Sequence, residues 1–286
     1  MIRPNHIIPL DAAYPGRWQS LRSKPVQVAV QGNLGLLQAA TTVAIVGSRA
    51  ASTASMQLAE RFAQQAAAAG MVVVSGGALG IDGAAHRGAL AQTIVVMGSG
   101  LRHWYPTRHV DLFTAVVAAG GALISTFPDD AQPVRSHFVA RNRFIAALAD
   151  VVVVVEAQPR SGSLSTAQYG WTLGRHVLAV PGSPGCDGLL GTGRAHICES
   201  FLDVAAAVRG EFRVAAVPPL ADEHCERLVA ALDTQPLDED ALAQRAGLTI
   251  QQTLRALCKL DGTPHVVKLP GQRFARPTTF CSATEH

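Results

Sequence analysis

The chain has 286 residues, of which 48% are hydrophobic and 16% charged, and its formal net charge is +3. This length can fold into one large and one small domain, and the apolar content excludes a wholly disordered chain. The apolar run Val151–Val155, like the other apolar runs of the chain, is too short to cross a bilayer, so we expect no membrane-spanning segment.

Short apolar segments alternate with helical segments from Thr41 to about residue 180. The expected strands are residues 42–46, 71–75, 93–97, 122–124, 151–156 and 176–180. The expected helices are residues 52–70, 82–90, 107–119, 141–148 and 161–173. The alternation predicts an α/β fold, a Rossmann-like, doubly wound and mostly parallel sheet over residues 41–212. Residues 1–40 show only turn signals and are predicted to form an irregular N-terminal extension.

A proline-containing segment, residues 213–221, is predicted to be a linker to a second domain. Beyond it, three helical patterns and a hairpin pattern over residues 222–277 predict a small winged-helix domain, with a tail over residues 278–286. The third helical pattern, residues 250–260, carries few side chains able to read bases. We therefore favour protein interaction over DNA readout for this domain.

Two predicted strands each end in a glycine-containing turn that leads into a helix. Gly47, Ser48 and Arg49 follow the first strand, and Gly76 and Gly77 follow the second. In an open α/β sheet, ligands bind beside the carboxyl ends of the strands, where helix N-termini present free N–H groups. The pattern predicts a phosphate or nucleic-acid site, although the first turn alone also fits a plain strand-to-helix connection.

The second turn leads to Asp82 and His86, which lie four residues apart and would share one helical face. This spacing can be mistaken for an acid–base pair. We expect Asp82 instead to cap or orient the glycine turn, and His86 to pack or hydrogen-bond nearby.

A basic and aromatic cluster lies between residues 133 and 143. Its members are Arg135, Phe138, Arg141, Asn142 and Arg143. Single-stranded nucleic acid is bound by cations that follow the phosphates and by rings on which bases stack. The alternative is that Phe138 belongs to the core and that an internal acid such as Glu156 pairs with the arginines. With the helix beginning near Arg141, its cations would oppose the helix dipole, which favours an external anion.

Two other segments have open alternatives. Ser161, Gly162 and Ser163 begin a predicted helix, where their hydroxyl and N–H groups could bind phosphate or simply cap the helix. Residues 104–106, Trp-Tyr-Pro, could form a stacking platform, but a packed turn is the favoured interpretation.

Several kinds of chemistry lack their sequence motifs. The chain has no G-x-x-x-x-G-K-[ST] phosphate loop, no G-x-G-x-x-G fingerprint and no G-x-S-x-G serine motif. No histidine pair or cysteine pair has the spacing of a metal site. Five scattered cysteines and an N-terminus without a signal segment indicate a reducing, cytoplasmic location. We therefore predict no catalytic residues, no metal and no cofactor.

An ordered set of motifs resembles the DNA-processing protein A family (DprA/Smf). The matching stretches are VAIVGSR at 43–49, VVVSGGALGIDGAAH at 72–86, GSGLRHWYP at 98–106, HFVARNRFIAAL at 137–148, VVVVEAQPRSGSLSTA at 152–167, GRHVLAVPG at 174–182, GCDGLLGTGRAH at 185–196 and LPGQRFAR at 269–276. The resemblance covers about residues 14–276. It implies a Rossmann-like domain that binds single-stranded DNA and a C-terminal winged helix.

The resemblance also implies a homodimer that protects incoming DNA and loads the recombinase RecA onto it in natural transformation. Carried over by position, Arg49, Arg135 and Phe138 are DNA contacts, together with the motif at residues 141–143. The chain departs from many relatives at Ser125-Thr126, where they have Ser-Glu, and we expect it to be without their N-terminal helical domain.

Two rival functions differ in class. One is a phosphoribohydrolase-like enzyme that processes nucleotides on a related Rossmann core, but residues 159–167 lack the glutamate of the PGGxGTxxE signature. The other is a protein-interaction scaffold with a vestigial anion site, which the basic and aromatic cluster argues against. The sequence therefore favours a non-enzymatic mediator that binds single-stranded DNA.

Overall fold

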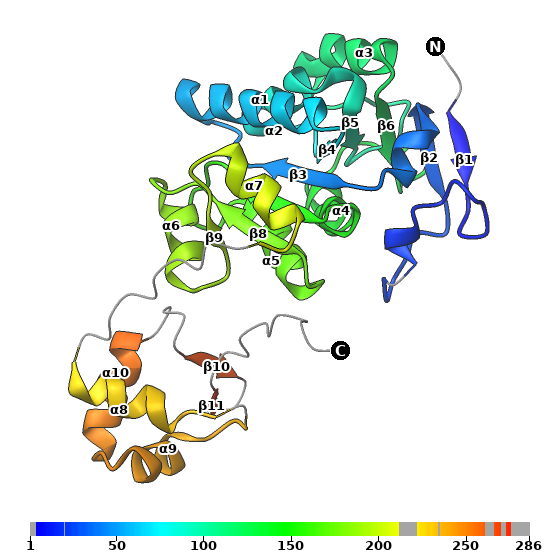
Figure 1. The fold of residues 1–286 in the computed structure, drawn as a ribbon. Helices are drawn as coiled ribbons and strands as arrows, with labels where there is room; N and C mark the ends of the chain where they lie inside the picture. Colours follow the sequence, from blue (N-terminus) through cyan, green and yellow to red (C-terminus); the bar gives the residue numbers. More distant parts are fainter. Residues whose placement is uncertain are drawn as a thin grey trace. The chain divides into compact units, whose positions relative to one another are not determined.

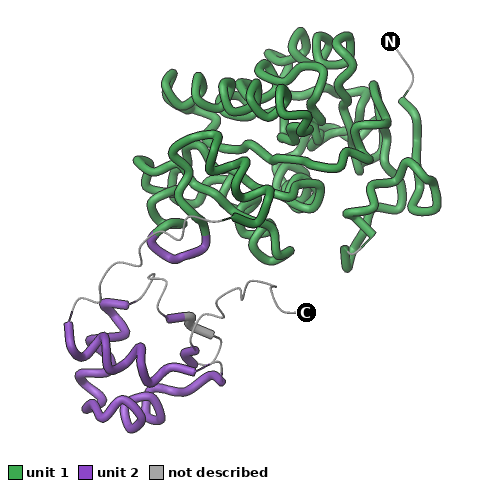
Figure 2. Tube along the Cα trace, viewed as in Figure 1, with its two compact units in different colours: residues 1–190, 195–213 green, residues 191–194, 214–286 purple. Residues whose placement is uncertain are grey.

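The computed structural model forms two compact units, which are described separately (Figure 2). The first comprises residues 1–190 and 195–213, and the second comprises residues 191–194 and 214–286. The structure describes residues 4–19, 21–211, 222–233, 235–260, 266–269 and 273–275. The predicted linker over 213–221 and the tail over 278–286 lie outside the described residues.

A nine-stranded sheet forms the centre of the first unit, in the order β1-β2-β6-β5-β4-β3-β7-β8-β9 (Figure 1). Its strands are β1 (Asn5–Ile7), β2 (Val28–Gly32), β3 (Thr42–Val46), β4 (Val72–Ser75), β5 (Thr93–Val96), β6 (Ala122–Ser125), β7 (Val151–Val154), β8 (His176–Ala179) and β9 (His196–Ile197). The strands from β6 to β9 in this order are parallel, whereas β1 and β2 are antiparallel additions at one edge. The predicted, mostly parallel sheet is confirmed.

The strand order reverses at β3. From β3 the chain moves outward through β4 and β5 to β6, and then returns to place β7 on the other side of β3. Such a switch point leaves a crevice at the carboxyl ends of the strands, where ligands bind in doubly wound folds.

Helices cover both faces of this sheet (Figure 1). On one face lie α1 (Thr53–Ala68), α2 (Ile81–Gly88), α3 (Val110–Ala119) and α7 (Phe201–Val208). On the other lie α4 (Arg135–Leu148), α5 (Gly162–Thr172) and α6 (Pro184–Gly191). Alternate residues of β3 therefore enter different cores, since Val43 and Ile45 pack with α1 while Ala44 and Val46 pack under α4. No helix in the described ranges is long and apolar enough to span a bilayer.

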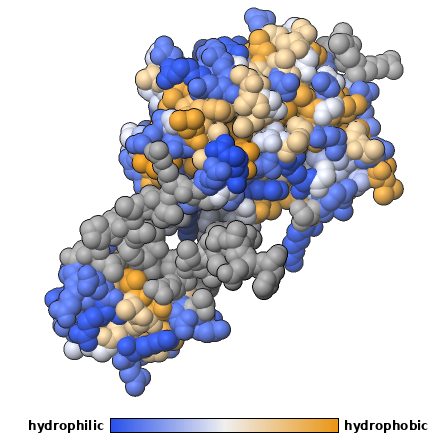
Figure 3. All heavy atoms as spheres, in the orientation of Figure 1, coloured by the Kyte–Doolittle hydropathy of each residue, from blue (hydrophilic) through white to orange (hydrophobic). Residues whose placement is uncertain are grey.

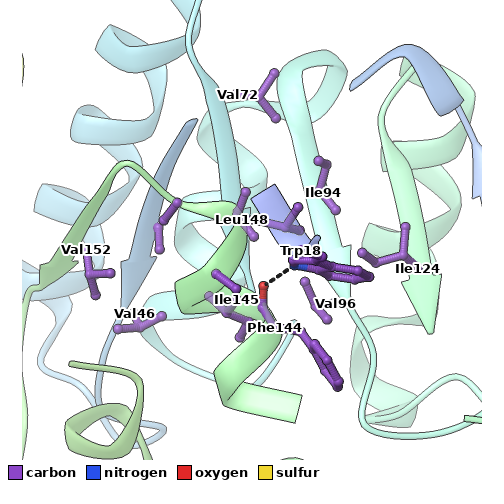
Figure 4. Close-up of a cluster of buried hydrophobic side chains, with 14 of the residues drawn as sticks. Trp18, Val46, Val72, Ile94, Val96, Ile124, Phe144, Ile145, Leu148 and Val152 are labelled. Carbon is purple, nitrogen blue, oxygen red and sulfur yellow. Dashed lines mark hydrogen bonds between the residues drawn. The ribbon is translucent and has the colours of Figure 1, made fainter. Parts of the chain in front are cut away.

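The core under α4 is anchored by Trp18, which is fully buried (Figure 4). Its indole N–H donates to the Phe144 carbonyl at 3.3 Å, and the two rings lie 5.1 Å apart between centroids. A buried indole requires a partner for its N–H, and the backbone of α4 supplies one.

The prediction of an irregular extension over residues 1–40 is wrong. Strands β1 and β2 extend the sheet, and the 3-10 helix η1 (Gly16–Trp18) carries Trp18 into the core. Arg17 also forms an ion pair with Asp150, at 2.8 Å, beside the amino end of β7. Short edge strands and a single anchoring ring give no periodic pattern, so local sequence reasoning missed them.

The second unit matches the predicted three helices and hairpin. Its elements are α8 (Glu223–Ala231), α9 (Glu239–Ala246), α10 (Ile250–Leu260), β10 (Val267–Leu269) and β11 (Arg273–Ala275). Leu228, Leu242 and Phe274 belong to its core. Asp238 caps α9 through the N–H of Ala241, and Gly247 ends this helix in the left-handed conformation.

Candidate nucleic-acid interface

The turns after β3 and β7 are joined at the switch point of the sheet. Gly47 leaves no room for a side chain, because a Cβ there would overlap Ile81 and the carbonyl of Glu156. The N–H of Ser48 donates to that same carbonyl at 2.7 Å. The first predicted turn is therefore held in place by backbone contacts to the turn after β7.

Arg49 projects from this fixed turn. Its side chain is exposed and forms no hydrogen bond or ion pair with any residue that the structure describes. The guanidinium carbon lies 5.6 Å from the centroid of the Phe138 ring, within the range of a cation–π contact. Arg49 is thus a cation available to an external anion.

The N-terminus of α1 is occupied by a carboxylate of the protein itself. Glu156 accepts hydrogen bonds from the N–H and the hydroxyl of Ser52, both at 3.0 Å. Burial raises the pKa of Glu156, but the hydrogen bonds from Ser52 and Ser55 outweigh it, so the pKa lies below its usual value. Glu156 caps α1 and forms no ion pair with Arg141 or with any other described residue.

The two glycines after β4 face inward. Gly76 and Gly77 are buried, and a Cβ at Gly76 would overlap the Arg141 guanidinium. Asp82 accepts the N–H groups of Gly76 and Ala78 at 3.2 and 3.3 Å, which confirms its expected role in orienting the turn. The Gly76 N–H and the carbonyls of Gly76 and Gly77 are bonded internally, so both glycines shape the turn. Contact of Gly76 and Gly77 with DNA stays a prediction.

Helix α4 begins at Arg135, six residues before the expected start. Val134, which follows Pro133, is extended and forms the N-cap. Arg141 therefore lies in the second turn of α4, so the dipole argument made for an external anion does not apply. The exposed cation of the first turn is Arg135, which has no hydrogen bond or ion pair among the described residues.

Phe138 links Arg49 to a second exposed ring. The Phe138 ring lies over Gly98, where a Cβ would overlap it, and its centroid is 5.5 Å from that of Tyr105. Phe138 is half-buried and belongs to none of the apolar cores, while Tyr105 is 42% exposed. We call Arg49, Phe138 and Tyr105 the stacking row.

The predicted Trp-Tyr-Pro turn divides between its two interpretations. Trp104 packs edge-on against Phe113, with 6.1 Å between ring centroids, as a packed turn requires. Tyr105 instead joins the stacking row. Beside the row, Phe127 and His137 form a second, nearly parallel stack with centroids 4.1 Å apart. The sequence did not identify this pair.

Two residues predicted to contact DNA lie inside the protein. Arg141 is 3% exposed and donates to the carbonyls of Gly76, at 2.5 Å, and Val96. Asn142 is 8% exposed and donates to the Gly162 carbonyl at 3.0 Å, which ties α4 to the start of α5. These partners leave neither side chain free to reach a ligand. Arg143 is half-buried and packs 4.5 Å over the Phe144 ring.

The start of α5 does not use the expected cap. Ser161 is the N-cap residue, yet its side chain forms no capping hydrogen bond. Its hydroxyl pairs with that of Ser163, at 2.7 Å, and Ser163 is buried. Phosphate binding at residues 161–163 stays a prediction.

Surface hydropathy does not by itself mark an interface. On the face shown in Figure 3, hydrophilic and hydrophobic residues are interspersed over the first unit. Within the described ranges, no group of three or more His, Cys, Asp or Glu side chains converges on a possible metal position. The stacking row is distinguished by the kinds of side chain that it brings together.

A family model described as DNA recombination-mediator protein A matches residues 5–209. The chain belongs to this family. A second model, the DprA winged helix domain, matches residues 213–272. Both confirm the resemblance drawn from the motifs and the predicted fold class, while the individual domain boundaries stay predictions.

Relatives and solved structures agree with this assignment. The chain is 34% identical to Protein Smf of Escherichia coli K12 over 290 residues, covering 94% of this chain and 77% of that protein. It is 39% identical to the DNA processing protein DprA of Streptococcus pneumoniae R6, covering 69% of this chain and 72% of that one. A Helicobacter pylori DNA processing protein A structure, concerned with its single-stranded DNA binding mode, matches with a TM-score of 0.67 and 29% identity. That match covers 73% of this chain and 98% of the other.

Proposed function

We propose that this protein binds single-stranded DNA along the stacking row and acts as a non-enzymatic recombination mediator. The observation that carries the proposal is the exposed Arg49 guanidinium, which has no ion pair among the described residues, beside the half-exposed Phe138 ring at the carboxyl edge of the sheet. A cation for phosphates and a ring for bases are the two elements that bind single strands without sequence preference. Arg135 adds a second free cation one turn away from Phe138.

Single strands are favoured over duplex because stacking on Phe138 and Tyr105 requires unpaired bases with open faces. The Helicobacter pylori relative, whose structure concerns single-stranded DNA binding, supports this choice. Transfer of that property to the present chain rests on the geometry of the stacking row.

The residues near the row support a binding role over an enzymatic one. Glu156 is engaged as the cap of α1, and Asp82 is buried and bonded to the glycine turn. His86 is fully buried against Thr93. All three groups are thus engaged in hydrogen bonds within the protein, whereas a general acid or base must reach the reacting group.

The decisive experiment compares fluorescence anisotropy isotherms for labelled oligo-dT and for a duplex of equal length. We expect tighter binding to the single strand, and a log–log salt slope of roughly −0.7 per phosphate neutralised. Arg49→Ala should weaken binding, whereas Arg61→Ala removes the same charge from an exposed position two turns into α1 and should not. Equal affinity for duplex, or equal effects of both substitutions, would refute the proposal.

We also propose that the protein is a homodimer that protects single-stranded DNA and loads RecA onto it. This part rests on family resemblance. Two stacking rows in one dimer would raise the effective concentration for a long strand, so long DNA should bind more tightly than a short oligomer. Light scattering tests the dimer, and RecA filament growth on DNA coated with single-strand-binding protein tests loading. A monomer, or unchanged filament growth, would refute the respective part.

For the winged-helix unit we propose protein interaction. Helix α10 exposes Ile250 and Leu254, which are 44% and 41% accessible, on the surface where a DNA-reading helix would place polar side chains. Arg255→Ala should leave affinity for single-stranded and duplex DNA unchanged. A clear loss of DNA affinity would favour readout instead.

A further inference from the structure

Three buried side chains from three elements hold the glycine turn after β4. The N–H of Gly76 donates to Asp82 of α2 at 3.2 Å, and its carbonyl accepts from Arg141 of α4 at 2.5 Å. The next carbonyl, that of Gly77, accepts from Nδ1 of His109, which belongs to the 3-10 helix η4 (Thr107–His109), at 3.0 Å. Three polar backbone groups of two neighbouring residues are thus fixed by side chains from different parts of the chain.

Packing leaves this arrangement little freedom. Gly77 has φ +71°, a conformation that favours glycine, and a Cβ there would press on Val95 and Phe113. Gly83 of α2 is equally restricted, because a Cβ there would overlap the imidazole of His109. Close-packed interiors transmit such displacements, so a change in one of the three side chains moves the turn.

The glycine turn after β4 also supports the backbone that carries Arg49. At its far end, Gly80 has φ +77°, and a Cβ there would overlap the carbonyl oxygen of Ser48. The next N–H, that of Ile81, donates to the same Ser48 carbonyl at 3.2 Å. A path from Arg141 to Arg49 therefore runs through the hydrogen bond to Gly76, the backbone of the glycine turn and its contacts with Ser48.

Arg141 is also an unusual group to bury. Its guanidinium lies more than 4 Å from every carboxylate that the structure describes, and its Nε has no hydrogen-bond partner among the described residues. Burial lowers its pKa to about 10, while Asp82 acts in the opposite direction and Arg49 adds to the lowering. Arg141 and Arg49 are therefore close enough to influence each other electrostatically.

We infer that Asp82, Arg141 and His109 are positioning residues, which set the geometry of the Ser48-Arg49 turn and thereby the affinity for DNA without touching it. This inference rests on the proposed function. It differs from the sequence-based assignment of Arg141 as a DNA contact, because a side chain that is 3% exposed and bonded to two carbonyls does not reach a ligand.

A double-mutant cycle tests the inference. Arg141→Lys keeps the charge but loses the guanidinium fork, and it is measured in the wild-type and Arg49→Ala backgrounds. We expect at least a tenfold loss of oligo-dT affinity in the wild type and less than a twofold loss in the Arg49→Ala background, since residues acting as one unit are not additive. Equal fold losses in both backgrounds, or wild-type affinity of the single variant, would overturn it.

Asp82→Asn provides the same test if Arg141→Lys fails to fold, because it weakens the contact to Gly76 and Ala78 from the other side. The matched control is Arg17→Lys, which weakens an ion pair to Asp150 at the opposite edge of the sheet. It should lower the melting temperature and leave DNA affinity unchanged. A similar loss of affinity in this control would show that general destabilisation explains the effect.

Hydrogen exchange separates this inference from the proposed function, because it needs no DNA. The amide of Ile81 donates to the Ser48 carbonyl, and the amide of Ser48 donates to the Glu156 carbonyl. Arg141→Lys should speed their exchange at least tenfold relative to amides in β8. Unchanged exchange would overturn the positioning role, whereas faster exchange in a protein that binds no single-stranded DNA would leave the positioning intact and refute the DNA site.

Discussion

Replacing Phe138 by Ala separates the contribution of the stacking row to binding from its contribution to stability. A base stacked on an aromatic ring contributes about 1–3 kcal/mol, so the loss of the Phe138 ring should raise Kd roughly 5- to 150-fold. The centroid of the Phe138 ring also lies 5.5 Å from that of the Tyr105 ring and 5.6 Å from the guanidinium carbon of Arg49. At a partly exposed site such contacts contribute about 0.5–1 kcal/mol each, so stability should fall by roughly 1–2 kcal/mol.

In a unit of this size, that loss corresponds to a fall in Tm of about 2–8 °C, which leaves the protein folded at 25 °C. Anisotropy with labelled oligo-dT gives the binding change, and a melting curve gives the stability change. The control is Phe138→Leu, which retains apolar volume but has no ring. Stacking requires Phe138→Leu to bind nearly as weakly as Phe138→Ala. Wild-type affinity of the Leu variant, or a lowered Tm with unchanged Kd, would assign Phe138 to packing alone.

Two further predictions concern a cation and a buried histidine. Arg49→Ala should reduce the salt slope by roughly 0.7, and Arg49→Lys should restore it. Arg49→Lys should recover only part of the affinity, because an ammonium lacks the guanidinium fork. Identical isotherms for the Lys and Ala variants would contradict this. Burial lowers the pKa of His86 to about 3. Between about pH 6.5 and this pKa, the unfolded chain therefore binds a proton at the imidazole that the folded protein does not bind. The free energy of unfolding should fall by ~1.4 kcal/mol for each unit by which the pH is lowered in this range. Denaturant titrations between pH 7 and 5 measure this pH dependence of stability. His86→Asn should remove the contribution of one proton from it.

The sequence predicted the parallel strands β3 to β8 within two residues, because their burial leaves a continuous apolar signature, and it missed the two-residue strand β9. Val151–Val154 is the clearest case. The start of α4 was missed because Arg135, Ser136 and His137 show no apolar periodicity, and only the extended Val134 after Pro133 marks the boundary. Residues 1–40 failed for a related reason, since their contribution to the core depends on contacts with distant strands.

The sequence predicted where the candidate site lies, but not which of its residues are exposed and which are buried. Arg135, Phe138 and Arg141 lie on one helix within seven residues, and sequence spacing gives no information about where the helix passes from the edge of the sheet into the core. In the structure this change falls between Phe138, which is half-buried, and Arg141, which is buried. The sequence therefore predicted Arg141 as a DNA contact, whereas in the structure its guanidinium donates to backbone carbonyls of the protein itself.

The burial of Arg141 also argues for its role in function. Removing a guanidinium from water is costly, and two carbonyl partners with a carboxylate beyond ion-pair distance compensate only part of that cost. An apolar side chain of similar volume would fill the same space without this penalty. What an apolar side chain lacks is the ability to fix the Gly76 and Val96 carbonyls from one point, at the ends of two neighbouring strands. If Arg49 must be held in one orientation to bind a phosphate, a rigid fork beneath its turn provides that restraint, which explains why a buried charge stands where packing alone would favour a hydrocarbon.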